Sequence, residues 1–359
     1  MSSATDISHS LTDVRNDINQ LLQEHINRQH SLAADMHADY ASLWEAIATV
    51  HQAGGKRMRP YLCVLAYEAL GGRDYQAILP VAGGLELLHF SMLVHDDIID
   101  RDFIRHGELN IGGIYKERYQ QLTDSVSEQV HFANSSAILA GDLLLSDAYQ
   151  MMATSSLPAD KKLQAIGFLG EAVYAVSGGE LLDTEAALHD PTYVDSLKVA
   201  EFKTAIYSCS IPLVIGGVLA GADAEIQLEL RHIGKCVGIA FQLADDLLGV
   251  FGASQETGKT TLGDLREGKR TYLLQRALHL ASPTEVTKLH GIIGHADITA
   301  AQADMARAIM VASGAKAEVE QLMRDYVSSA EVAVNGLDIT NAAKKLLLAF
   351  ITKAVWRSS

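Results

Sequence analysis

The sequence predicts an all-α protein, organised as a single large helical bundle. Helix-forming Ala and Leu are abundant, only 6 of the 359 residues are proline, and runs with the period-two alternation of strands are scarce. The hydrophobic fraction of 48% is enough for one sizeable core. No linker rich in Pro, Gly or Ser divides the chain, so we expect one domain over residues 1–359, with N-terminal helices of about residues 1–50 packed on the bundle.

Apolar residues recur at helical spacing along most of the chain. This periodicity predicts helices at residues 11–30, 36–51, 76–101, 129–154, 160–187, 193–219, 223–251, 268–281, 301–331 and 339–355. Pro60 opens a further helix, because proline is tolerated in a first turn, where its missing N–H has no helical partner. The pairs Gly54-Gly55, Gly71-Gly72 and Gly112-Gly113 predict breaks between helices.

The formal net charge of −15 argues against binding to nucleic acid or to an anionic membrane, since either would need a basic surface. The three cysteines, Cys63, Cys209 and Cys236, lie far apart in apolar sequence, so we expect buried free thiols in a cytoplasmic protein. The longest apolar stretch, residues 211–222, is interrupted by Pro212 and two glycines, and it predicts no transmembrane segment.

A first acidic cluster, His95-Asp96-Asp97-Ile98-Ile99-Asp100, ends the long apolar helix expected over residues 76–101. Asp96 and Asp100 are four residues apart and lie on one helix face, whereas Asp97 is rotated by about 100°. Like charges near the negative end of a helix dipole are unfavourable and require a cation. Mg²⁺ fits, because it prefers oxygen ligands and keeps water or phosphate in its shell.

A second apolar helix ends in the sequence Phe241-Gln242-Leu243-Ala244-Asp245-Asp246. Two helices of the same design, far apart in sequence, suggest carboxylates that face each other across a cleft. Such a cleft could bind several divalent ions, which would in turn hold a diphosphate. Taken alone, either cluster could also be an exposed acidic helix end.

A basic segment supplies further groups that a diphosphate site needs. Gly54-Gly55-Lys56-Arg57-Met58-Arg59-Pro60 is a glycine turn followed by three cations and a helix start. Backbone N–H groups at a helix start bind anions together with cationic side chains. Other basic residues follow the first cluster or lie in the second half of the chain, namely Arg105-His106, Lys203, Lys259 and Lys269-Arg270.

In their order along the chain, these motifs resemble the trans-isoprenyl diphosphate synthases, a family that includes farnesyl and geranylgeranyl diphosphate synthases. GGKRMRP, HDDIID followed by RHG, FKTA, FQLADD, TGK and GDLREGK occur in sequence between residues 50 and 280. The resemblance implies a bundle around a central active-site cavity, a homodimer and a prenyltransferase. The implied reaction is the Mg²⁺-dependent head-to-tail condensation of isopentenyl diphosphate with allylic diphosphates, with three ions per site.

The resemblance also implies individual roles. The metal would be bound by Asp96, Asp100 and Asp245, with Asp97 and Asp246 assisting. The substrates would be held by basic residues, isopentenyl diphosphate by Lys56, Arg59 and His89, and the allylic diphosphate by Arg105, Lys203, Lys259 and Lys269. Thr204 and Gln242 would line the reacting centre.

Three positions depart from the pattern of the family. His106 stands where a second arginine is usual, and without the guanidinium fork isopentenyl diphosphate should bind more weakly. Gly249 replaces the last aspartate of the second motif, but we expect activity to survive because Asp245 is the expected ligand. Glu180 replaces a usual glutamine, while Asp183 is kept and could orient metal-bound water.

Product length should depend on residues upstream of Asp96, namely Met92, Ser91 and Leu88. In the resembled family, a bulky aromatic residue at the position of Ser91 gives a short product. Serine is small, so the growing chain should pass it and stop about one helical turn deeper, near Leu88. We therefore expect a C20 product, geranylgeranyl diphosphate, with C15 or C25 and longer products as alternatives. Ser91→Phe or Ser91→Tyr should shorten the product.

Two other functions share some of these features. A terpene cyclase also has an aspartate-rich helix end, but it would need an Asn/Asp, Ser/Thr and Glu triad where this chain has Asp245-Asp246. The expected second diphosphate site at Lys56 and Arg59 also favours condensation. A non-catalytic partner subunit would typically have lost aspartates of the first cluster, and all three are present here.

Overall fold

The computed structural model describes residues 8–105, 107–191, 193, 195–252 and 263–356. It is 80% helical, and the only strands among the described residues form one short pair, so the predicted all-α class is confirmed. The chain divides into two compact units. The N-terminal unit comprises Ile7–Leu169 and Ile215–Gly221, and the C-terminal unit comprises Gly170–Val214 and Ala222–Ser359. The single domain expected from the sequence stays a prediction.

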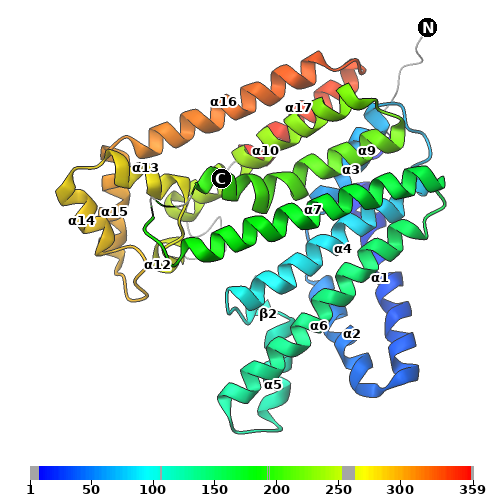
Figure 1. The fold of residues 1–359 in the computed structure, drawn as a ribbon, viewed down its shortest axis with the longest axis horizontal. Coiled ribbons are helices and arrows are strands. Elements are labelled where there is room, and N and C mark those ends of the chain that lie inside the picture. The colour runs from blue at the N-terminus through cyan, green and yellow to red at the C-terminus, as the bar shows by residue number, and fades with distance from the viewer. Residues whose placement is uncertain (1–7, 106, 192, 194, 253–262, 357–359) are drawn as a thin grey trace. The chain divides into compact units, whose positions relative to one another are not determined.

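The N-terminal unit is built around the apolar helix α4, which packs against α1, α3, α5 and α6. Its helices, coloured blue to green in Figure 1, are α1 (Leu11–Met36), α2 (Ala38–Gln52), α3 (Met58–Ala69), α4 (Tyr75–Ile99), α5 (Ile111–Gln120) and α6 (Val126–Ala153). Strands β1 (Ile104–Arg105) and β2 (Glu108–Leu109) pair in antiparallel fashion. The N-terminal helices α1 and α2 belong to this unit, where α1 contacts α2, α3 and α4, and α2 also contacts α5 and α6.

The C-terminal unit is built around α10, which packs against the π-helix η1 and against α16 and α17. Its elements are α8 (Ser196–Val199), η1 (Ala200–Ser210), α10 (Ala224–Phe251), α12 (Gly263–Glu267), α13 (Tyr272–Leu280), α14 (Pro283–His290), α15 (Ala300–Ala312), α16 (Ala315–Gly336) and α17 (Asn341–Val355). The division between the units falls within α7 (Ala159–Ala186) and α9 (Ile211–Ala220).

The helix boundaries follow ordinary capping chemistry. Asp74 and Asp223 accept hydrogen bonds from the first-turn N–H groups of α4 and α10. Gly54 and Gly71 adopt φ values of 90° and 94°, which only glycine accepts easily, so the first two predicted glycine breaks are confirmed. Pro60 lies in the first turn of α3, as predicted.

Several predicted elements were wrong in detail. The helix expected over residues 301–331 is two helices, α15 and α16, because Gly314 adopts a φ of 85° between them. The helix expected over 193–219 contains the π-helix η1. The third glycine pair is not a break but lies inside α5, where a Cβ on Gly113 would overlap the carbonyl oxygen of Phe103. Helices α5, α12 and α14 and the strand pair were not predicted.

By length and composition alone, three described helical stretches could cross a membrane, namely Tyr75–Ile99, Ala159–Ala186 and Ser196–Ala220. The stretch that led to the expectation of no transmembrane segment, residues 211–222, overlaps only the third of these helical stretches. In the first and third stretches, 78% of the most apolar window is buried within the protein. Packing in the protein core therefore accounts for the hydropathy of these two stretches.

Candidate active site

Two carboxylates of the first acidic cluster are paired with an arginine of the chain itself. Asp96 and Asp97 belong to the last turn of α4, and Arg105 lies in β1. The Arg105 Nε donates to Asp97 Oδ1 at 2.8 Å, and its Nη2 donates to Asp96 Oδ2 at 3.0 Å. Asp100 is the exposed C-cap residue of α4. The cation required beside these carboxylates is thus partly supplied by Arg105.

Asp97 differs from its neighbour in burial. Its side chain is 10% exposed, compared with 24% for Asp96. Burial raises the pKa of Asp97 to about 6, and the nearby carboxylates of Asp96 and Asp102 act in the same direction, while Arg105 opposes both effects. Asp97 therefore turns toward the interior and Arg105, and Asp96 is the more accessible of the two carboxylates.

The basic segment gathers positive charge around His89 of α4. Burial holds the pKa of His89 well below its usual range, and the nearby guanidinium groups of Arg59, Arg105 and Arg57 lower it further. The imidazole is therefore neutral at physiological pH. Lys56 is exposed and Arg59 is half-buried at the start of α3. Such a cluster of cations beside a helix N-terminus is suited to a diphosphate.

One of the three cations in this segment is not available to a ligand. The Arg57 side chain is buried and donates from Nη1 to Glu86 Oε1 at 2.9 Å. The sequence analysis counted Arg57 among the three cations of this segment but gave it no role in holding a substrate. Spacing does not reveal which of three neighbouring cations turns inward.

In the C-terminal unit, Lys203 of η1 is held by two carboxylates of α7. Its Nζ donates to Asp183 Oδ2 at 2.7 Å and to Glu180 Oε1 at 3.1 Å. Glu180 is the residue that departs from the family pattern. Because its side chain carries a charge where glutamine would not, it strengthens the hold on Lys203 in the absence of substrate.

The predicted residues of the second motif form a chain of hydrogen bonds. Thr204 Oγ1 donates to Gln242 Oε1 at 2.9 Å, and Gln242 Nε2 donates to Asp246 Oδ1 at 2.9 Å. Asp245 is exposed at the preceding position of α10. The amide of Gln242 is therefore fixed between η1 and the second acidic cluster.

One glycine of α7 and one of α10 lie against the part of η1 that carries Lys203 and Thr204. A Cβ on Gly179 would overlap the backbone nitrogen of Lys203, and a Cβ on Gly238 would overlap the backbone of Ala205. Helices α7 and α10 thus both approach η1 at backbone distance. A π-helix is rare and is often found at functional sites.

The remaining predicted substrate-binding residues are two that lie outside the described part of the chain and one exposed lysine. His106 and Lys259 lie outside the described residues. Lys269 is exposed, and its Nζ lies 3.3 Å from Glu267 Oε2. The first acidic cluster belongs to the N-terminal unit and the second to the C-terminal unit, so the expected cleft between them stays a prediction.

The carboxylates of each acidic cluster are of the chemical kind that Mg²⁺ prefers. Asp96, Asp100 and Asp245 offer hard oxygen donors, and they retain accessible surface. Within the described part of the chain, no three His, Cys, Asp or Glu side chains converge as a closed metal site.

The residues expected to control product length differ in exposure. Ser91 is 0% exposed, and its Oγ donates to the carbonyl oxygen of Gly141 in α6 at 2.8 Å. Leu88 is 1% exposed, whereas Met92 is half-buried. The small side chain of Ser91 therefore lies where α4 packs closely on α6, and the sequence alone did not reveal this contact. Its role in product length stays a prediction.

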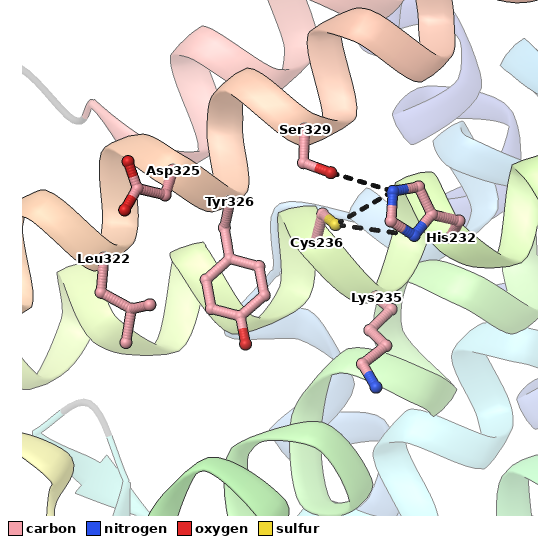
Figure 2. Close-up of a pocket in the computed structure, with 7 residues that line it drawn as sticks. All are labelled: His232, Lys235, Cys236, Leu322, Asp325, Tyr326 and Ser329. Atoms are coloured by element: carbon pink, nitrogen blue, oxygen red, sulfur yellow. Dashed lines mark hydrogen bonds between the residues drawn. The ribbon is translucent and has the colours of Figure 1, made fainter.

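A cavity of about 370 Å³ lies elsewhere, between α10 and α16 of the C-terminal unit. Figure 2 shows its lining residues, which are His232, Lys235 and Cys236 from α10 and Leu322, Asp325, Tyr326 and Ser329 from α16. None of them was predicted as a site residue. Burial raises the pKa of the Cys236 thiol, which disfavours the nucleophilic thiolate. We assign no chemistry to this cavity.

Comparisons with known proteins agree with these motifs. The polyprenyl synthetase family model matches residues 41–311. A geranylfarnesyl diphosphate synthase of Aeropyrum pernix is 34% identical over 313 residues, which cover 84% of this chain and 90% of the relative. A geranylgeranyl diphosphate synthase of Sulfolobus acidocaldarius is 30% identical over 280 residues, which cover 76% of this chain and 75% of the relative.

A solved structure matches over nearly the whole chain. It is a geranylgeranyl pyrophosphate synthase from Corynebacterium glutamicum, complexed with isoprenyl diphosphate and magnesium, with 30% identity and a TM-score of 0.90. The match covers 98% of this chain and 100% of that chain. Fold and motifs together define an all-helical prenyltransferase. The chain belongs to the polyprenyl synthetase family, which confirms the resemblance to the trans-isoprenyl diphosphate synthases.

Two residues of importance were missed by sequence reasoning. Glu86 and Arg57 form a buried ion pair beside the basic segment. The signal for Glu86 was present, since it is the one carboxylate within the apolar run from Val81 to Leu88 of a long helix. A charge in such a run needs a partner, but the sequence does not say which one, since Arg73 and Arg101 are both nearer to Glu86 along the chain than Arg57 is.

Proposed function

We propose that this enzyme condenses isopentenyl diphosphate head to tail with allylic diphosphates and that it depends on Mg²⁺, with three ions per site. The observation that carries the proposal is the cationic cluster around His89, which lies on the same helix as the carboxylates of Asp96 and Asp97 and shortly before them. A diphosphate-binding group and a metal-binding group thus occur on one helix. Relatives named as prenyl diphosphate synthases support the same reaction.

In this reaction, bound Mg²⁺ would neutralise the leaving diphosphate, so that its bond to the allylic carbon can break. Asp96, Asp100 and Asp245 would hold the ions, and Asp97 would keep Arg105 in place beside them. Lys56, Arg59 and neutral His89 would orient isopentenyl diphosphate, whose double bond attacks the allylic carbon as the diphosphate leaves. The cation formed by this attack then loses a proton, which the departed diphosphate accepts. The chain contributes positioning and charge stabilisation, and no nucleophilic side chain is required.

The remaining basic and polar residues would act on the allylic substrate. Lys203 would leave Glu180 and Asp183 for the diphosphate, and Lys259 and Lys269 would reach the same group. Gln242, fixed by Thr204 and Asp246, would face the reacting centre. His106 would contact diphosphate more weakly than arginine does.

We infer a C20 product, geranylgeranyl diphosphate, because Ser91 leaves no bulky side chain five residues before Asp96. A C15 product or one of C25 and longer is the alternative, as the named relatives include a geranylfarnesyl diphosphate synthase. We further propose that the enzyme is a cytoplasmic homodimer. Helix α6 supports the dimer, since Phe132, Ile138 and Leu139 are 45%, 45% and 58% exposed.

Product analysis tests this proposal. Purified protein is incubated with isopentenyl diphosphate, Mg²⁺ and, separately, dimethylallyl, geranyl or farnesyl diphosphate, and the dephosphorylated alcohols are separated by chromatography. A dominant C20 alcohol is expected, and chelation of Mg²⁺ should abolish it. A C15 alcohol, or one of C25 or longer, would keep the reaction and correct the role of Ser91. No condensation with any primer would favour a non-catalytic partner subunit.

A further inference from the structure

A single buried guanidinium joins the basic segment to three other helices. The Arg57 side chain is 8% exposed, although Lys56 beside it is exposed. Its Nε donates to Asn19 Oδ1 of α1 at 2.8 Å, and its Nη1 donates to Glu86 Oε1 of α4 at 2.9 Å. Its Nη2 lies 3.4 Å from Nδ1 of His51 in α2. The start of α3 is thus tied to α1, α2 and α4.

The backbone of the segment is shaped around this side chain. Arg57 has φ 51° and ψ 40°, a left-handed conformation that is unfavourable for a residue with a Cβ. A Cβ on Gly55 would lie 2.7 Å from Arg57 Nη1, so the guanidinium folds back against the glycine. Such a conformation persists only where surrounding contacts determine it, and here the bonds of the guanidinium provide those contacts.

The charges of the network make it depend on both partners. Glu86 is 3% exposed and lies in an otherwise apolar part of α4, so its carboxylate needs Arg57 for compensation. Burial and the charge of Arg57 lower the pKa of His51 to about 4, so this ring is neutral at physiological pH. Glu86 precedes His89 by three residues on α4, which places the ion pair one turn from the proposed diphosphate site.

We propose that Arg57 and Glu86 are positioning residues that hold Lys56 and Arg59 in the geometry needed to bind isopentenyl diphosphate. The proposal rests on the function proposed above for Lys56 and Arg59. Arg57 touches no substrate in this role. It fixes the turn that carries Lys56 and Arg59, so that these two side chains are already ordered before isopentenyl diphosphate binds.

Two single variants test the role of the pair. Arg57→Lys keeps the charge and loses the planar fork, and Glu86→Gln keeps the shape and loses the charge. Each should raise the KM for isopentenyl diphosphate at least tenfold, while the KM for the allylic diphosphate stays within twofold. The Kd for isopentenyl diphosphate alone, measured by calorimetry, should rise with its KM.

A second buried pair in the same unit provides the control. His25 Nε2 and Asp147 Oδ2 lie 2.6 Å apart and join α1 to α6. Asp147→Asn should lower the Tm without changing either KM. The double variant Arg57→Met with Glu86→Met replaces the charges by apolar groups, which often preserves stability. Its Tm should be closer to that of the unmodified protein than the Tm of either single variant is, while the KM for isopentenyl diphosphate stays high.

The outcomes separate positioning from a structural role and from failure of the proposed function. An unchanged KM in Arg57→Lys and Glu86→Gln, or two KM values that rise together as Tm falls, would overturn the positioning role. Lys56→Ala reports on the site itself and should also raise the KM for isopentenyl diphosphate. If Lys56→Ala and Arg59→Ala leave this KM unchanged, the diphosphate site is wrongly assigned, and the positioning role falls with it.

Discussion

Arg105 supplies positive charge to two adjacent carboxylates at a helix end. Asp96 and Asp97 would repel each other beside the negative end of α4, and the guanidinium bonds to both of them. Sequence reasoning required a cation at this place and chose Mg²⁺. Arg105 meets part of that requirement before any metal binds, so binding of Mg²⁺ and diphosphate would rearrange an existing ion pair.

Glu180 offers a residue-scale test of how substrate competes for Lys203. Glu180→Gln removes one of the two carboxylates that hold the Lys203 ammonium. The KM for the allylic diphosphate should fall about threefold, because a partly exposed ion pair is worth about 0.2–1 kcal/mol. Steady-state kinetics at saturating isopentenyl diphosphate measure this change.

The matched control for this test lies on the same helix. Glu171 of α7 pairs with Arg231, and Glu171→Gln should leave the KM unchanged. An increase in the KM for Glu180→Gln would contradict the prediction and would mean that Glu180 itself helps to bind the substrate or its metal.

His51 should make stability depend on pH. Its pKa is about 4 in the folded protein and 6.5 in an unfolded chain. Between these values only the unfolded chain binds the proton, so stability is fully present above pH 6.5 and is lost as the pH falls toward 4. The loss is on the order of 3 kcal/mol.

Urea unfolding at pH 7 and pH 5 measures this dependence. His51→Gln cannot take up a proton, so its free energy of unfolding should change less between the two pH values than that of the unmodified protein. The exposed His131, replaced by Gln, serves as the control and should leave the pH dependence as it is. Equal pH dependence in His51→Gln and the unmodified protein would exclude this role.

The sequence motifs include residues that the structure joins, but residue spacing does not give the orientation of each side chain. Thr204, Gln242 and Asp246 occur in motifs, and the structure joins them by hydrogen bonds. Arg57 occurs in a motif as well, but its side chain serves the interior. Which cation of a basic segment turns inward depends on a carboxylate 29 positions away, and local spacing carries no such information.

At the scale of elements, the amphipathic helices were predictable and the π-helix was not. Helices α1, α4, α6 and α10 have strong apolar patterns and clear N-cap residues, so periodicity finds them. The π-helix η1 continues the same apolar pattern with a different hydrogen-bond register. The glycines of α7 and α10 that approach η1 most closely, Gly179 and Gly238, lie outside it in sequence, so its own residues do not reveal this packing.

Two adjacent glycines of α7 test the role of that close approach. Gly179→Ala should push η1 away from α7, displace Lys203 and lower kcat/KM at least tenfold, or about 1.4 kcal/mol. At Gly178, by contrast, an added methyl group would have no other atom within 4 Å. Gly178→Ala should therefore keep activity and gain about 0.5–1 kcal/mol of stability. Similar kinetics for the two variants would show that the approach at Gly179 does not matter.

At the scale of the whole molecule, the exposed apolar residues of α6 predict self-association. The chain has a mass of 38.7 kDa, so light scattering should give 2 × 38.7 = 77.4 kDa. Leu139→Glu, which introduces a charge on this helix, should shift the mass toward that of one chain. Val311 of α15 is 54% exposed, and Val311→Glu should leave the dimer intact. A single-chain mass for the unmodified protein would contradict the proposed dimer.

The contact between Gly55 and Arg57 also limits how this chain can vary through evolution. A side chain at position 55 would occupy the space of the guanidinium, and loss of the guanidinium would leave Glu86 as a buried charge without compensation. Substitutions at positions 57 and 86 should therefore occur together, and a substitution at position 55 should occur only after them. Descendants of this sequence that lose the arginine are expected to have lost the glutamate as well, and only they are free to replace the glycine.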